Sequence, residues 1–145
     1  MPIRTAQPQD LETVYALMCE LEAEELPRPA FDRMYAENLR NPWIRYLLAE
    51  EEGAVCGLIS LHAKEPLHRA ARVGEVMELI VAEPWRGRGI GKALLAAAQA
   101  EGKAMGCAGL ELHSSMGRTA AHAFYQHEGW EKHALFFTLD LGEAT

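Results

Sequence analysis

The stretch that decides the fold is Gly74–Lys92, GEVMELIVAEPWRGRGIGK. Its first part, Gly74–Val81, is rich in apolar and β-branched residues and predicts a buried strand that Pro84 ends. Three glycines and three cations follow within Arg86–Lys92. The next residues, KALLAAAQAEGKAM, are rich in alanine and leucine, which favour helix. The stretch therefore predicts a strand, a glycine-rich turn and a helix in direct succession.

The glycine-rich turn Arg86–Lys92 has the composition of a phosphate-binding loop. Glycines let backbone N–H groups approach an anion closely, and a helix start adds unpaired N–H groups and the positive end of its dipole. Arg86, Arg88 and Lys92 add charge. A Walker loop does not fit, because Arg86 stands in place of its first glycine and Ala93 in place of its Ser or Thr. A tight turn that binds no ligand is the alternative interpretation.

The remaining segments complete a mixed α/β pattern. Strands are expected at residues 3–5, 46–50, 55–62, 110–113 and 134–141, and helices at residues 10–21, 31–39 and 118–127. The two central strands form a hairpin around Glu52-Gly53. This order predicts one domain over residues 1–145, with a mixed sheet and helices on both faces.

Composition limits the classes of function. The chain has 145 residues, 49% hydrophobic and 24% charged, as expected of one globular domain. No apolar run reaches the ~18 residues of a spanning helix, and the N-terminus lacks a secretory signal. A net charge of −7 argues against nucleic-acid binding. Cys19, Cys56 and Cys107 form no CxxC pair, which favours free thiols in a reducing compartment. We therefore expect a cytoplasmic protein without nucleic-acid or membrane partners.

Two motifs identify a family. The pattern Arg86-x-x-Gly89-x-Gly91 and the segment Ala120–Trp130, AAHAFYQHEGW, resemble the most specific motifs of the GCN5-related N-acetyltransferase family. The resemblance implies an α/β fold whose mixed sheet of six or seven strands splays between the fourth and fifth strands. It also implies an enzyme that transfers an acetyl group directly from acetyl-CoA to the primary amine of a small molecule.

The resemblance also implies where acetyl-CoA binds. The backbone of the fourth strand would pair with the pantetheine, and N–H groups of the loop would hold the pyrophosphate. The implied residues are Leu79, Ile80, Val81, Arg86, Gly87, Arg88, Gly89, Ile90, Gly91, Lys92, Ala121 and Phe124.

Acetyl transfer to an amine needs two proton transfers, one from the amine and one to the departing thiolate. Glu78 is the candidate base, expected on one strand face with Val76 and Ile80, because burying a carboxylate without purpose is costly. Glu75 is expected on the other face. Tyr125 matches the tyrosine that protonates the thiolate in the family. The alternatives are a solvated or salt-bridged Glu78 and a tyrosine that only packs in the core.

The acceptor amine is less closely defined. Short segments from Asn38 to the C-terminus resemble bacterial N-acetyltransferases that act on aminoalkylphosphonates. The candidate acceptor residues are Arg45, His62, Arg69, Arg72 and His113. A polyamine would instead need carboxylates, which Glu20–Glu25 could supply. Amino acids, protein N-termini and lysines are further alternatives, as is a non-catalytic acyl-CoA-binding sensor.

Two further expectations concern metals and partners. No histidine pair has HxxxH or HExxH spacing, so no metal site is expected. The alternative is a His–Glu–His cluster of His62, Glu78 and His113, whose strands are expected to be neighbours. Few residues follow Trp130, which would leave the acceptor side open. A second copy of the chain in a homodimer could complete it, through exposed apolar residues such as Trp43, Phe136 and Phe137.

Overall fold

The computed structural model describes residues 2–114, 119–134 and 136–142. The chain divides into two compact units, Met1–Leu112 and His113–Thr145. The first unit holds strands β1 (Ile3–Thr5), β2 (Ile44–Glu51), β3 (Ala54–Lys64), β4 (Val73–Val81) and β5 (Gly109–Leu112), and helices α1 (Leu11–Glu22), α2 (Arg28–Leu39) and α3 (Ile90–Ala104). The second holds α4 (Thr119–His127).

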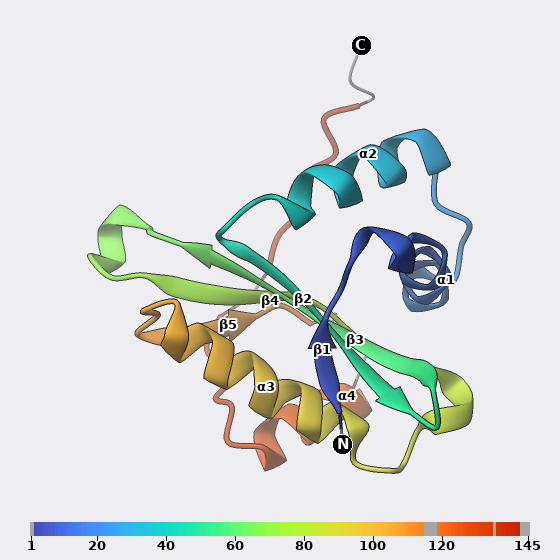
Figure 1. Ribbon diagram of the computed structural model, residues 1–145. Helices are drawn as coiled ribbons and strands as arrows, with labels where there is room; N and C mark the ends of the chain where they lie inside the picture. The colour runs from blue at the N-terminus through green and yellow to red at the C-terminus, as the bar shows by residue number, and fades with distance from the viewer. Residues whose placement is uncertain (1, 115–118, 135, 143–145) are drawn as a thin grey trace. The chain divides into compact units, whose positions relative to one another are not determined.

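The five strands form one sheet in the order β1-β2-β3-β4-β5. Neighbours from β1 to β4 are antiparallel, and β5 is parallel to β4. Helices α1 and α2 cover one face and α3 covers the other (Figure 1). The predicted mixed sheet with helices on both faces is confirmed.

The predicted count of six or seven strands was too high for the described part of the chain, which has five. The expected strand at 134–141 is absent from residues 134 and 136–141. Its side chains Phe137, Leu139 and Leu141 are 83–91% exposed. Alternating apolar residues favour a strand, but a strand also needs a ladder partner for its backbone groups.

The pairing of β3 with β4 contains one irregularity. Ser60 pairs with Glu78, but the next residue of β3, Leu61, pairs with Val76. Met77 is therefore an extra residue on β4, as in a β-bulge. Its side chain is 46% exposed in the middle of an otherwise buried or half-buried strand.

This bulge corrects one prediction about the site. Directly paired residues share a face of the sheet, so Glu75, opposite His62, lies on the same face as Glu78, opposite Ser60. Val76 lies on the other face, with α3. The prediction that Glu78 shares its face with Val76 and that Glu75 lies opposite was wrong. An inserted residue shifts the alternation by one position.

The two faces of the sheet have separate cores. On the α1 and α2 side, Leu48, Leu58 and Ile80 pack with residues of both helices, including Val14 and Tyr35. On the α3 side the packing is close. A Cβ added at Gly57 would lie 2.9 Å from the Ile80 carbonyl oxygen and 3.1 Å from Leu94 Cδ1. Glycine at this position therefore lets α3 approach the sheet.

Candidate active site

A polar row crosses the sheet on the face of α1 and α2. Tyr46 of β2 pairs with Ser60 of β3, which pairs with Glu78 of β4. The adjacent row pairs His62 with Glu75. On this face the apolar pair Leu58–Ile80 is therefore followed, further along the strands, by pairs that carry hydroxyl, imidazole and carboxylate groups.

The Glu78 carboxylate is held by its neighbour across the ladder. The hydroxyl of Ser60, which is fully buried, donates a hydrogen bond to Glu78 Oε1. The backbone N–H of Glu78 donates to the same Ser60 Oγ, over 3.0 Å. One serine therefore fixes both the backbone and the half-buried side chain of Glu78.

His62 lies on the same face as the two carboxylates, directly opposite Glu75. Burial lowers the pKa of His62 below its usual value, and the negative charge of Glu78 opposes that shift. Glu75 is ion-paired with Lys64. A largely neutral imidazole therefore shares the face with two carboxylates and one ammonium group.

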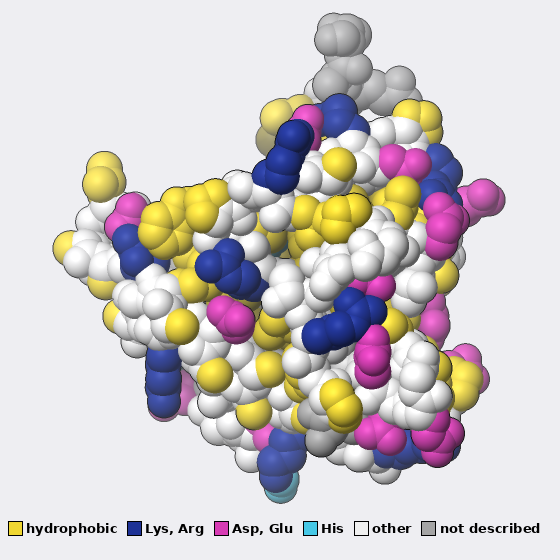
Figure 2. Space-filling view, viewed as in Figure 1, with side chains coloured by type: hydrophobic (Ala, Val, Ile, Leu, Met, Phe, Trp, Pro, Cys, Tyr) yellow, Lys and Arg dark blue, Asp and Glu magenta, His cyan; other side chains and the backbone are white. Residues whose placement is uncertain are grey.

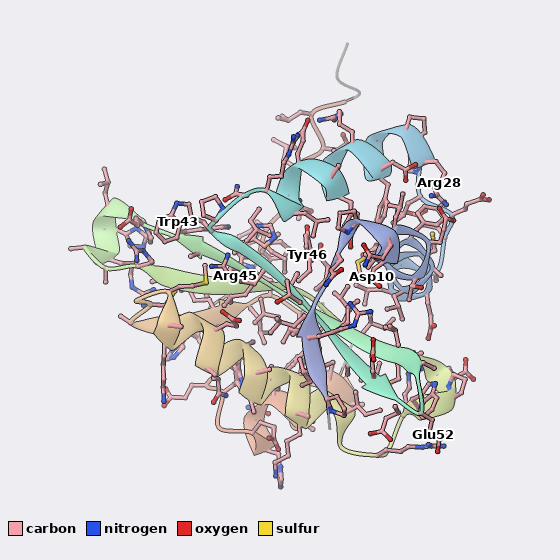
Figure 3. All side chains as sticks on the ribbon, viewed as in Figure 1. Asp10, Arg28, Trp43, Arg45, Tyr46 and Glu52 are labelled. Atoms are coloured by element: carbon pink, nitrogen blue, oxygen red, sulfur yellow. The ribbon has the colours of Figure 1, made fainter. Side chains whose placement is uncertain are left out.

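Tyr46 is the member of the polar row on β2, on the side of Ser60 away from Glu78. Its hydroxyl accepts a hydrogen bond of 2.8 Å from Asn38 Nδ2 on α2, and its ring lies 5.8 Å from that of Tyr35. Burial raises the pKa of Tyr46, with Asn38 opposing and Glu78 adding to the shift. The phenol therefore keeps its proton at neutral pH. Figure 3 shows Tyr46 beneath α2, whereas its neighbour Arg45 points toward α3.

Strand β4 continues beyond its partner β5. The last pair of that ladder is Val76 with Leu112, so from Glu78 to Val81 β4 pairs with β3 alone within the described residues. The β4–β5 ladder ends at this pair because β5 ends at Leu112, and the splay between the fourth and fifth strands stays a prediction. Glu78 therefore lies just beyond the last pair between β4 and β5.

The glycine-rich loop that follows has an open backbone. Gly87 and Gly89 both have φ of +81°, and a Cβ added at either would meet nothing within 4 Å. Gly89 is the N-cap of α3, and no side chain caps the helix there. The N–H groups at this helix start are therefore available to a phosphate.

The three cations of the loop differ in their surroundings. Arg86 Nη2 lies 2.9 Å from Glu20 Oε2 on α1, and Arg86 Nε donates to the Val81 carbonyl over 3.0 Å. The Arg88 guanidinium lies 4.8 Å from the centre of the Trp85 ring. Lys92 is exposed. The loop thus offers open N–H groups and exposed positive charge, which fit the phosphates of acetyl-CoA.

Most of the predicted acceptor residues lie elsewhere. Arg45 pairs with Leu61 on the α3 side, where its Nε lies 3.7 Å from Glu101. Arg69 is paired with Glu111 at 2.9 Å. Arg72 donates to the Met105 carbonyl over 2.5 Å, and its guanidinium lies 4.3 Å from the centre of the Trp43 ring. In the first unit, the structure brings only His62 of this predicted set into the rows with Glu78 and Glu75.

The second unit holds the remaining predicted residues. Ala121, Phe124 and Tyr125 are half-buried on α4. The Tyr125 ring lies 5.6 Å from the ring of Phe124 and 6.3 Å from that of Trp130. The backbone N–H of Trp130 donates to the Tyr125 carbonyl over 3.0 Å. The FY-x-x-x-GW motif therefore folds back at the helix end. His113 stacks on Phe136, with ring centres 4.4 Å apart.

Sequence reasoning missed three residues of the polar row. Ser60, Tyr46 and Asn38 were not among the predicted site residues. The available signal was Ser60 itself, a polar residue in the apolar strand sequence VCGLIS, two positions before His62. The position of Asn38 beside Tyr46 depends on how α2 packs on β2.

Among the described residues, no group of three or more His, Cys, Asp or Glu side chains could hold a metal ion. Within the same residues, no helix is long and apolar enough to cross a membrane. Lysine and arginine side chains lie singly among acidic ones on the face shown in Figure 2.

The sequence matches the model of the Acetyltransferase (GNAT) family over residues 11–130, so the chain belongs to this family. Aminoalkylphosphonate N-acetyltransferase of Salmonella typhimurium (strain LT2) is 43% identical over 136 residues, which are 94% of this chain and 88% of that protein. An aminoglycoside N-acetyltransferase, AAC(6')-Iy in complex with CoA, has a TM-score of 0.87 at 22% identity, covering 97% of this chain and 95% of its own. A Trypanosoma brucei acetyltransferase has a TM-score of 0.79 at 26% identity, covering 97% and 99%.

These comparisons establish the class of the protein. The chain is an N-acetyltransferase, and acetyl-CoA is its acyl donor. The predictions of the family, the α/β fold, the enzyme class and the donor are confirmed.

Proposed function

We propose that the enzyme acetylates the primary amine of an aminoalkylphosphonate, with Glu78 as the general base. The observation that carries the base role is a half-buried carboxylate, fixed by Ser60, just beyond the last pair between β4 and β5. The 43% identity to an aminoalkylphosphonate N-acetyltransferase supports the choice of acceptor.

Glu78 would take the proton that the amine must lose. Acetyl-CoA supplies the acetyl group as a thioester. The amine nitrogen forms a bond to the acetyl carbon, the carbon–sulfur bond breaks, and the amine proton passes to the Glu78 carboxylate, directly or through a water molecule. The departing thiolate takes a proton from the Tyr125 hydroxyl. This role of Tyr125 rests on the family motif that contains it.

The donor site would be formed by strand and loop together. The open edge of β4 at Leu79–Val81 would pair with the pantetheine, and the loop N–H groups with Arg88 and Lys92 would hold the phosphates. Arg86, paired with Glu20, would secure the loop. Ala121 and Phe124 would contribute from α4.

The acceptor site would use the face that carries Glu78. The amine would lie between the carboxylates of Glu78 and Glu75, which attract its ammonium form before the proton is lost. The phosphonate would need a cation, and Lys64, which is paired with Glu75, is the candidate on this face. His62, whose pKa is lowered by burial, would contribute as a neutral hydrogen-bonding group. Arg45 and Arg72, with their contacts elsewhere, are less suited to this role.

An acceptor panel tests the proposal. The purified enzyme is incubated with acetyl-CoA and, separately, an aminoalkylphosphonate, the matching aminoalkyl carboxylate, a polyamine and a lysine peptide, and free thiol is followed. We expect the highest kcat/KM with the phosphonate. Faster release with the polyamine or the peptide would refute the acceptor class while leaving the enzyme class intact.

We also propose a cytoplasmic enzyme without nucleic-acid or membrane partners, and a homodimer. Free thiols at Cys19, Cys56 and Cys107 support a reducing compartment. Phe136 and Phe137 are 60% and 83% exposed, which supports a contact with a second copy. Light scattering at assay concentrations tests the dimer, and a monomeric mass would refute it.

A further inference from the structure

We propose that Ser60 is a positioning residue that holds the Glu78 carboxylate in its working orientation. The inference rests on the proposed role of Glu78 and extends it to a residue on the neighbouring strand. It is carried by the two hydrogen bonds that join these residues and by the bulge beside them.

The bulge lies directly beside the Ser60–Glu78 pair. Met77 is inserted where β4 would otherwise continue a regular ladder with β3. A bulge disturbs the ladder locally and can leave a backbone donor without its usual acceptor. Beside this bulge, the N–H of Glu78 donates a hydrogen bond of 3.0 Å to the Ser60 hydroxyl.

The Ser60 hydroxyl can still donate one hydrogen bond while it accepts the one from the Glu78 N–H. A serine oxygen accepts through lone pairs and donates one hydrogen. Because Ser60 Oγ accepts from the Glu78 N–H, its own O–H is aimed at Glu78 Oε1. Ser60 is fully buried, so water does not compete for either bond. The carboxylate therefore keeps one oxygen on Ser60, and the other oxygen is left to receive the proton of the amine.

Two other polar side chains on this face, Tyr46 and Lys64, are bonded to other residues. Tyr46, opposite Ser60 on the other side, has its hydroxyl bonded to Asn38. Lys64 is paired with Glu75. Among the bonds within the described residues, the Ser60 hydroxyl supplies the hydrogen bond to the Glu78 side chain.

A double-mutant cycle tests the inference. Ser60→Ala should lower kcat about 10- to 100-fold, the range for losing a hydrogen bond to a charged group. The KM for acetyl-CoA should stay unchanged, since the loop is not altered. Ser60→Thr, which keeps the hydroxyl, should restore most of the turnover. In a Glu78→Gln background, Ser60→Ala should cost less than about threefold, because residues that act through one another are not additive.

The control separates positioning from packing. Ile59→Val removes one carbon from the fully buried neighbour of Ser60, on the α3 side, and should leave kcat unchanged. Urea unfolding of each variant shows that the assayed protein is folded. If Ser60→Ala does not fold, Ser60→Cys, with a weaker donor of similar size, replaces it.

Two results would overturn the inference: turnover of the folded Ser60→Ala variant within about twofold of the parent, or an equal fold-loss in both backgrounds. Near-normal turnover of Glu78→Gln by itself would instead refute the base role of Glu78, so the two failures are distinguishable.

Discussion

The sheet face that packs on α3 and the face that packs on α1 and α2 share the same strands but differ in chemistry. Toward α3, Ile59, Leu61 and Leu94 are fully buried, and glycines allow close approach. Toward α1 and α2, an apolar patch gives way to Ser60 and Glu78 and their polar neighbours. The α3 face consists of closely packed apolar side chains, whereas the other face carries a carboxylate just beyond the last pair between β4 and β5. Substitutions on the two faces should therefore change different properties.

The largest effect is expected from Glu78→Gln. The amide cannot accept the amine proton, so kcat should fall by about 10²–10⁴, as for loss of a general base. The variant keeps the size of the side chain and should remain folded. Steady-state thiol release and circular dichroism check both points. Turnover close to the parent value would show that the polar face does not supply the base.

The matching change on the other face is Leu94→Ala. Leu94 is fully buried between α3 and the sheet, so its truncation should lower the free energy of unfolding by about 2–5 kcal/mol. Turnover per folded molecule should be kept. Urea unfolding measures the loss of stability. A strong decrease in kcat of the folded variant would contradict the expectation that the α3 face affects stability and not turnover.

A smaller loss of stability is expected from Gly57→Ala. The new Cβ would lie 2.9 Å from the backbone oxygen of Ile80, which can move only with its strand. Overpacking of this kind costs about 1–3 kcal/mol. Gly109→Ala is the control, because a Cβ there would meet nothing within 4 Å. Equal unfolding midpoints for the two variants would contradict the close packing of β4 and α3 around Gly57.

His62 should make stability depend on pH. Burial lowers the pKa of His62 in the folded state, so the unfolded chain binds this proton at higher pH than the folded chain does. The free energy of unfolding should therefore be retained above the ordinary histidine pKa of about 6.5 and decrease as the pH falls below it. Unfolding of the parent and of His62→Gln at several pH values checks this. Identical pH slopes would show that His62 is not buried in its neutral form.

The smallest effect is expected from Arg45→Gln. Arg45 lies on the α3 face and pairs with Glu101 at 3.7 Å, so the acceptor KM should change by less than about twofold. Lys64→Gln, on the polar face, should raise the acceptor KM several-fold. If Arg45→Gln raised the acceptor KM more than Lys64→Gln does, the acceptor would be expected to bind on the α3 side of the sheet.

The sequence was sufficient for the parts of the site that are local. A glycine-rich turn between a strand and a helix requires only the order of residues, and Arg86–Lys92 folds as predicted, with Gly89 at the start of α3. Glu78 on β4 was likewise apparent as a carboxylate in an apolar strand. The prediction of a strand at 134–141 was wrong for residues 134 and 136–141, because alternation of apolar residues does not supply a strand to pair with.

By itself the sequence determined the order of elements, the family and the nature of the donor, since each depends on residues close together in the chain. The tertiary structure decided which side chains meet. The bulge at Met77 placed Glu75 and Glu78 on one face, and strand register brought Ser60 to Glu78 and Tyr46 to Ser60. Register is set by packing between distant segments, and a shift of one residue exchanges the faces. For that reason Arg45, a plausible acceptor residue from its sequence position, lies on the side opposite to Glu78.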